Sequence, residues 1–180
     1  QYNVPSGFKD LILGECQSRS ELQQLILSVF KKWGYKEIVT PIVEYYDTYV
    51  KGFKDIREQE FYKLIDSSNR ILALRADMTI PIVRVASTRF NSASLPLRCS
   101  YSASVYKSQK QLSGMMNEMT DCGVELIGMS AEESDLEILL TAIDTLKAIN
   151  RPFTFEIGNI NYFKEACHEM PLNAEVTNPL

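Results

Sequence analysis

Histidine is scarce in this chain, which has 180 residues and a single histidine, His168. The four cysteines, Cys16, Cys99, Cys122 and Cys167, include no Cys-x-x-Cys pair. A zinc site needs clustered cysteine and histidine ligands at short spacing, so the sequence predicts no metal site. The cysteines are instead expected to be small buried hydrophobic residues in a reducing compartment.

Long apolar runs are also missing. No run of about 18 uncharged apolar residues occurs, so we expect no membrane-spanning helix. The N-terminal residues lack a basic stretch followed by an apolar one, so we expect no secretory signal and a cytoplasmic protein. The net charge of −4 argues against a broad nucleic-acid-binding surface, which would need an excess of Lys and Arg, although a local basic patch remains compatible with it.

The composition that remains is that of a globular domain. Hydrophobic residues make up 45% of the chain and charged residues 23%, which is typical of a soluble protein with a core of useful size. This length fits one domain, so we expect a single domain over residues 1–180.

The first half of the chain alternates between helical and strand patterns. Apolar residues recur at helical spacing over residues 17–33, where a helix should end at Gly34. Residues 36–40 have a β-branched strand pattern, and Pro41 should end that strand. The turn residues 66–69 lie between two further strand patterns, which predicts a hairpin over residues 61–74.

The second half predicts a helix near Thr79, which is expected to cap it, and long antiparallel strands over 97–106 and 117–127. A capping box over 130–133 should begin another helix. The residues expected on its buried face are Leu136, Leu139, Leu140, Ile143 and Leu146.

Two more elements are predicted after that helix. Alternation over residues 153–157 predicts a strand, and residues 161–170 a short helix. Because several strands are joined by hairpins or loops rather than by crossovers, the sequence predicts an α+β domain with a largely antiparallel sheet flanked by helices.

Three segments together resemble one family, the class II aminoacyl-tRNA synthetases in their histidyl branch. GYKEIVTPIVE over residues 34–44 is similar to the family's first motif, a helix and a strand closed by proline. LRADMTIPIVR over residues 74–84 resembles its substrate loop, and residues 97–128 resemble its strand–loop–strand centre. The resemblance spans nearly all of residues 5–165. It implies a class II synthetase-like antiparallel sheet and a dimer formed through the first motif.

The residues that hold ATP in that family are altered here. The family pattern has an aromatic residue, an arginine that binds the ATP α-phosphate, and a glutamate two residues on. In this chain Tyr106 is followed by Lys107, and Gln109 takes the place of the acid. Lysine keeps a positive charge but lacks the bidentate fork of arginine. The family's loop arginine, expected near Met115, and its third motif are absent as well, so we expect no catalytic residue and no cofactor.

Four residues are candidates for binding histidine by this resemblance. Asp77 stands at the acid that binds the α-amino group, and Thr79 at the adjacent hydroxyl. Glu125 matches a glutamate near the imidazole, where a carboxylate accepts the ring N–H, and Asp121 replaces a glutamine that contacts the substrate. The alternatives are a helix-capping carboxylate for Asp77, a plain helix cap for Thr79, a solvated strand face for Asp121 and a structural ion pair for Glu125.

A synthetase-like domain with a damaged ATP site is similar to the regulatory subunits of ATP phosphoribosyltransferase. That similarity implies a non-catalytic subunit needed for activity and for histidine feedback inhibition in the first step of histidine biosynthesis. The expected partner is a short-form catalytic subunit, within a hetero-oligomer that contains a homodimer of this chain and no tRNA. These residues would form the N-terminal part of a longer subunit, or a trimmed form of it. The alternatives are the catalytic core of a histidyl-tRNA synthetase, or another synthetase-like amino-acid-sensing domain.

Overall fold

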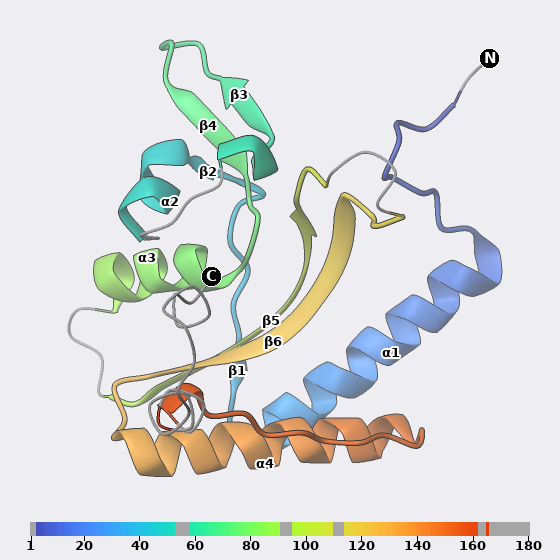
Figure 1. Ribbon diagram of the computed structural model, residues 1–180, viewed down its shortest axis with the longest axis vertical. Helices are drawn as coiled ribbons and strands as arrows, with labels where there is room; N and C mark the ends of the chain where they lie inside the picture. The colour runs from blue at the N-terminus through green and yellow to red at the C-terminus, as the bar shows by residue number, and fades with distance from the viewer. Residues whose placement is uncertain (1–2, 53–57, 91–94, 110–113, 162–164, 166–180) are drawn as a thin grey trace.

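The computed structural model describes residues 3–52, 58–90, 95–109, 114–161 and 165 (Figure 1). No helix in these residues is long and apolar enough to cross a membrane. The elements, in chain order, are α1 (Leu13–Lys32), β1 (Lys36–Glu37), β2 (Val43–Tyr45), α2 (Tyr46–Gly52), the 3-10 helix η1 (Glu58–Glu60), β3 (Lys63–Ile65), β4 (Ile71–Leu74), α3 (Thr79–Arg89), β5 (Leu97–Tyr106), β6 (Glu118–Ile127) and α4 (Ala131–Ile149).

The strands form two small sheets, ordered β1-β5-β6 and β2-β4-β3. β5 and β6 pair antiparallel along their whole length, from Leu97 opposite Ile127 to Tyr106 opposite Glu118. Both pairs of the second sheet are also antiparallel, whereas β1 runs parallel to β5. The predicted α+β fold with a largely antiparallel sheet is therefore confirmed, with one short parallel edge strand.

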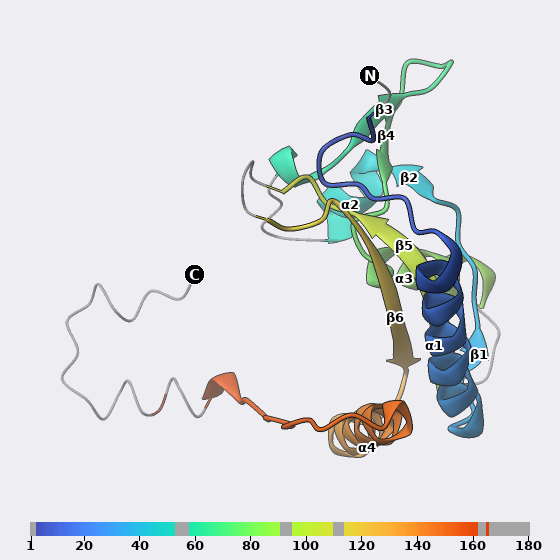
Figure 2. The same cartoon turned by 90° about the vertical axis from the view of Figure 1, so that its right-hand side faces the viewer.

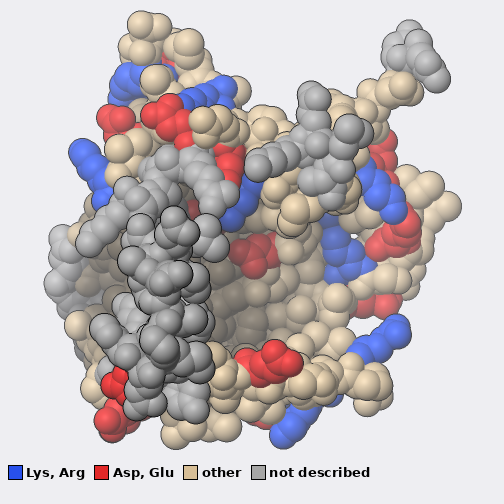
Figure 3. Space-filling view, in the orientation of Figure 1, with Lys and Arg blue, Asp and Glu red and all other residues tan. Residues whose placement is uncertain are grey.

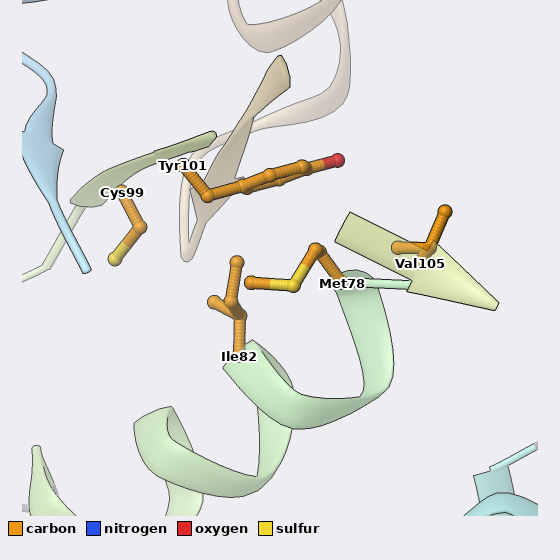
Figure 4. Packing of buried hydrophobic residues seen from close by; sticks show 5 residues of the cluster. All are labelled: Met78, Ile82, Cys99, Tyr101 and Val105. Atoms are coloured by element: carbon orange, nitrogen blue, oxygen red, sulfur yellow. The ribbon is translucent and has the colours of Figure 1, made fainter. Parts of the chain in front are cut away.

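Helices cover both faces of the long β5–β6 hairpin. Gln23 of α1 donates a 2.6 Å hydrogen bond to Ser102 on one face, and Met78 and Ile82 at the start of α3 pack on the other. α4 crosses the end of α1, below the foot of β6 (Figures 1 and 2). The α3 side carries a buried cluster, shown in Figure 4, that consists of Met78, Ile82, Cys99, Tyr101 and Val105.

Arg75 joins the two sheets. Its side chain is buried and donates from Nε to the Ser104 carbonyl at 2.7 Å and from Nη1 to the Thr40 carbonyl at 2.9 Å. Its backbone N–H donates to the Ile42 carbonyl, and its own carbonyl accepts from the Tyr106 N–H at 2.9 Å. These four bonds hold the segment that follows β4 against the end of β5.

Several predicted boundaries differ from the structure. The first helix begins at Leu13, four residues before the predicted start. The strand predicted over 36–40 is reduced to Lys36–Glu37, although the Ile38 N–H still donates to Ser100 at 2.9 Å. The strand ends at Glu37, before Pro41, so the prediction that Pro41 ends it is wrong, and the chain resumes as β2 in the other sheet. The hairpin over 61–74 is confirmed as β3 and β4.

The strand predicted over residues 153–157 is wrong for the structure, which leaves that segment irregular. Phe153 and Ile157 are 43% and 68% exposed. An alternating segment becomes a strand only beside a neighbour, and none of the described strands lies next to it. Of the helix predicted over 161–170, all but two residues lie outside the described part.

α4 buries less of its apolar face than predicted. Leu136 and Leu140 are 58% and 41% exposed, because α4 crosses α1 and β6 and is covered only along part of its length. Ser130 takes the predicted N-cap position, but its hydroxyl donates to the Glu133 carboxylate at 3.1 Å instead of making the expected bond to the helix backbone.

Candidate functional site

The register of β5 and β6 places chemically useful side chains on one face of the hairpin. Cys99 lies opposite Glu125, Tyr101 opposite Gly123, and Ala103 opposite Asp121. Because side chains alternate along a strand, these six residues share the face that the start of α3 covers. The structure thus brings Asp121 and Glu125 together with the segment that carries Asp77 and Thr79.

The structure assigns the helix cap to Asp77 and not to Thr79. The prediction that Thr79 caps the helix is wrong, since Thr79 already lies in the first turn and its Oγ1 donates to Glu125 Oε1 at 2.8 Å. Asp77 Oδ1 instead accepts the Ile80 N–H at 3.0 Å, which satisfies a free backbone donor of α3. Asp77 therefore does cap the helix, as its alternative interpretation held. A carboxylate has about four acceptor sites, so capping leaves room for a ligand.

Burial and neighbouring acids act on two of the carboxyl groups, Asp77 and Glu125. Burial raises the pKa of Asp77, and the charge of Asp121 adds to this, while the Ile80 N–H and the Lys107 ammonium oppose it. Burial also raises the pKa of Glu125, opposed by the Thr79 hydrogen bond and reinforced by Asp77 and Asp121. These effects of one acid on another require the three acids to lie within electrostatic reach.

Sequence reasoning missed Tyr101, which lies at the centre of this group. The residue is 7% exposed, and burial together with the charges of Asp121, Glu125 and Asp77 raises the pKa of its phenol. Its ring lies over Gly123, where any added Cβ would collide with the phenol oxygen. Figure 4 shows its hydroxyl directed away from Cys99. Only the alternation of β5, once its register with β6 is known, could have found it.

Lys107 follows β5 directly and is half-buried. Its backbone N–H donates to the Asn117 carbonyl at 2.9 Å, and the Gln109 N–H donates to Asn117 Oδ1, also at 2.9 Å. The charge of Lys107 lowers the pKa of Asp77. The lysine at the place of the family arginine is therefore part of the electrostatic surroundings of the candidate site.

Two bidentate ion pairs fix the helices around this site. Arg84 of α3 binds both oxygens of the buried Glu44 of β2, the acid of the first motif. Arg98 of β5 binds both oxygens of Glu137 of α4 at 2.7 Å, and the Tyr35 hydroxyl donates to the same carboxylate at 2.9 Å. Charge-assisted pairs of this geometry hold elements in a defined orientation.

The site suits cationic ligand groups. In the orientation of Figure 1, Figure 3 shows acidic atoms within a hollow of the surface near the β5–β6 hairpin. Carboxylates accept strong hydrogen bonds from ammonium and imidazolium N–H groups. Lys107, beside these acids, can bind the carboxylate of a free amino acid. The α-ammonium and α-carboxylate of such a ligand are attached to the same carbon, so both can be bound at neighbouring positions.

Comparisons with known proteins agree with this geometry. A family model described as histidyl-tRNA synthetase matches residues 7–180. An ATP phosphoribosyltransferase regulatory subunit of Acetivibrio thermocellus is 39% identical over 178 residues, which are 98% of this chain and 43% of that protein. The same kind of subunit in Clostridium acetobutylicum is 34% identical over 98% of this chain and 44% of that protein. This chain thus spans less than half the length of these relatives.

Solved structures give the same result. A crystal structure of an ATP phosphoribosyltransferase regulatory subunit/histidyl-tRNA synthetase from Bacillus halodurans has a TM-score of 0.74 and 31% identity, and covers 82% of this chain and 38% of that one. The apo histidyl-tRNA synthetase of S. aureus, at 20% identity and a TM-score of 0.68 over 82% of this chain and 35% of that one, shares the fold. With a family model matched from residue 7 to residue 180, this chain belongs to the histidyl-tRNA synthetase family.

Proposed function

We propose that this chain is a non-catalytic regulatory subunit of ATP phosphoribosyltransferase, acting in the first step of histidine biosynthesis. The observation that carries this proposal is a cluster of acids beside an altered ATP position. Asp77, Asp121 and Glu125 stay within electrostatic reach of one another, while Lys107 stands in place of the nucleotide-binding arginine and acts on Asp77. The similarity to subunits of that name over 98% of the chain supports it.

In this proposal histidine is the ligand and the acids are its receptors. Asp77 accepts from the α-ammonium group, with Thr79 beside it, and Glu125 and Asp121 accept from the imidazole. Feedback inhibition then follows if histidine binds one state of the assembly more tightly than another. No catalytic residue and no cofactor of this chain is required.

The partner is a short-form catalytic ATP phosphoribosyltransferase, within a cytoplasmic hetero-oligomer that binds no tRNA. Within it, two copies of this chain pair through the segment around Pro41, where Val39 and Ile42 are 85% and 45% exposed. A symmetric dimer places the same apolar patch on both sides of the interface.

We further propose that these residues are the N-terminal part of a longer subunit. The chain spans 43% of its relative from A. thermocellus. The exposed alternating residues Phe153 and Ile157 are consistent with a strand whose neighbour lies in the remaining part.

Co-purification tests the partnership. Tagged full-length protein, expressed with the short-form phosphoribosyltransferase of the same genome, should retain that enzyme through gel filtration and raise its activity. Addition of histidine should then reduce the activity. If the enzyme elutes alone and its activity does not change, the regulatory assignment is wrong and an amino-acid sensor of another system remains.

Pyrophosphate exchange tests the synthetase alternative. The protein should show no histidine-dependent exchange of pyrophosphate into ATP. A rate within a few-fold of an ordinary histidyl-tRNA synthetase would establish that alternative. Lys107→Arg together with Gln109→Glu should not restore exchange, because other family residues that hold ATP are also replaced.

A further inference from the structure

The acidic cluster, defined as Asp77, Asp121 and Glu125, carries more negative charge than its described surroundings neutralise. All three carboxylates act on Tyr101, since each raises the pKa of that phenol. Within the described part of the chain, Lys107 is the cation whose charge lowers the pKa of Asp77. Three formal negative charges therefore face one positive charge.

Tyr101 gives a second and independent indication of a ligand. Its side chain is more than nine-tenths buried, and its hydroxyl has no hydrogen-bond partner among the described residues. The phenol oxygen lies over Gly123, between Asp121 and Glu125 on β6, so it points into the acidic cluster. Buried phenols normally find a partner. The hydroxyl and the carboxylates thus face one shared space.

Among the described residues, the other titratable and charged neighbours add no further positive charge to the cluster. Cys99 of β5 and Tyr49 of α2 are neutral groups, and the pKa of each is raised by burial and by a carboxylate of the cluster. The Arg75 guanidinium is bound to the carbonyls of Thr40 and Ser104. The cluster therefore favours any ligand that brings more positive charge than a neutral zwitterion does.

We propose that the acidic cluster binds histidine with two positive charges, an α-ammonium and a protonated imidazole, so that histidine takes up a proton as it binds near neutral pH. This inference rests on the proposed function, in which histidine is the ligand. A protonated imidazole donates from both nitrogens, whereas a neutral one donates from a single nitrogen. Two donors match Glu125 on one side and Asp121 or the Tyr101 oxygen on the other, while Lys107 meets the ligand carboxylate.

The sign of the pH dependence follows from this pairing. Two carboxylates raise the pKa of the bound imidazole above its free value of about 6.5. The full affinity is then present below the free pKa and is lost as the pH rises. Between the free and bound pKa values the affinity falls about tenfold per pH unit, since one proton is bound with each ligand. In acid the carboxylates themselves become protonated, and the affinity falls again.

Calorimetric titration measures the proton directly. Histidine is titrated into the full-length protein at pH 7.5, in phosphate and in Tris, two buffers with very different heats of ionisation. The expected uptake is about 0.9 proton per histidine, because free imidazole is about nine-tenths neutral at this pH. Asp121→Asn removes one charge of the cluster without changing its shape, and should reduce the uptake and flatten the pH profile of affinity.

Glu118→Gln is the matched control. It also changes a carboxylate of β6 to an amide, but Glu118 lies on the other face and accepts a 3.2 Å hydrogen bond from Tyr106. It should behave as the wild type does. Binding without proton uptake, or with proton release, overturns this inference and leaves the regulatory assignment intact. Absence of histidine binding from pH 5.5 to 8.5 overturns the inference and the ligand assignment together, while co-purification tests the partnership separately.

Discussion

Thr79 Oγ1 donates a 2.8 Å hydrogen bond to Glu125 Oε1, which joins the first turn of α3 to β6 near the end of that strand. The two residues are 46 positions apart in the chain and come from two of the segments that resemble the synthetases. The bond fixes one oxygen of Glu125 and leaves the other oxygen available to a ligand. It also lowers the pKa of a carboxyl group that burial and neighbouring acids raise.

Loss of this bond should weaken the site more than the fold. Thr79→Val keeps the shape of the side chain, and should reduce the free energy of unfolding by about 1 kcal/mol, measured by urea denaturation. Because Glu125 would then be protonated more readily, histidine affinity at pH 6 should fall further than affinity at pH 8. Thr79→Ser retains the hydroxyl and serves as the control. Equal affinities for all three proteins would mean that this bond does not orient the ligand-binding carboxylate.

Asp77→Asn and Glu125→Gln should each weaken histidine binding about tenfold or more. Hydrogen bonds to charged groups contribute roughly 1.5–3 kcal/mol, and 1.4 kcal/mol corresponds to tenfold in affinity. Asn caps helices as well as Asp does, so the fold should survive the first change. Asp66→Asn, in the turn between β3 and β4, is the control and should bind histidine normally. If titration calorimetry on full-length protein shows unchanged affinity for both test variants, histidine binds elsewhere.

A charge at Ile42 should weaken the proposed homodimer. Ile42 is 45% exposed beside Pro41, so Ile42→Asp places a charge within the apolar patch and costs the monomer little. Ile38 is unsuitable for this test because it packs against the buried cluster under α3. Light scattering over a range of concentrations should show a shift toward monomer for Ile42→Asp, and no shift for Ile65→Asp in β3. The same shift for both variants would place the interface elsewhere.

Glu137→Gln should destabilise the protein at neutral pH and matter less in acid. Bonds from Arg98 and Tyr35 lower the pKa of Glu137 despite partial burial. A group whose pKa is lowered by folding contributes stability above its unfolded pKa, which is near 4.5, and loses that contribution as the pH falls through the folded value. Urea denaturation at pH 7 should therefore show a loss of about 1–2 kcal/mol for a part-buried bidentate pair.

The difference from wild type should narrow at pH 3. Glu15→Gln, which breaks an exposed ion pair with Lys9, is the control and should change stability little at either pH. A constant difference between pH 7 and pH 3 for Glu137→Gln would show that packing, and not charge, is lost.

Alternation and turn chemistry were enough to predict the β5–β6 pair and the β3–β4 hairpin. They could not predict Tyr101, because its place among the acids depends on the register of two strands, and strand patterns do not encode register. Thr79 was wrongly predicted to cap α3 because the capping residue depends on where the helix begins. Asp77 was an equally suitable capping residue by its chemistry. The strand predicted over 153–157 is not formed. Alternation shows only that a segment can pair as a strand, and pairing also requires a neighbouring strand, which alternation does not predict.

The bonds of Arg75 have a mechanical consequence. Arg75 lies two positions before Asp77. Its side chain donates to the Thr40 carbonyl and its backbone N–H to the Ile42 carbonyl. It also forms hydrogen bonds with Ser104 and Tyr106 at the end of β5. The apolar segment around Pro41 therefore cannot be displaced without either breaking these bonds or moving the start of α3. A contact made at that surface and a ligand held at Asp77 share one rigid connection, so each can alter the equilibrium position of the other.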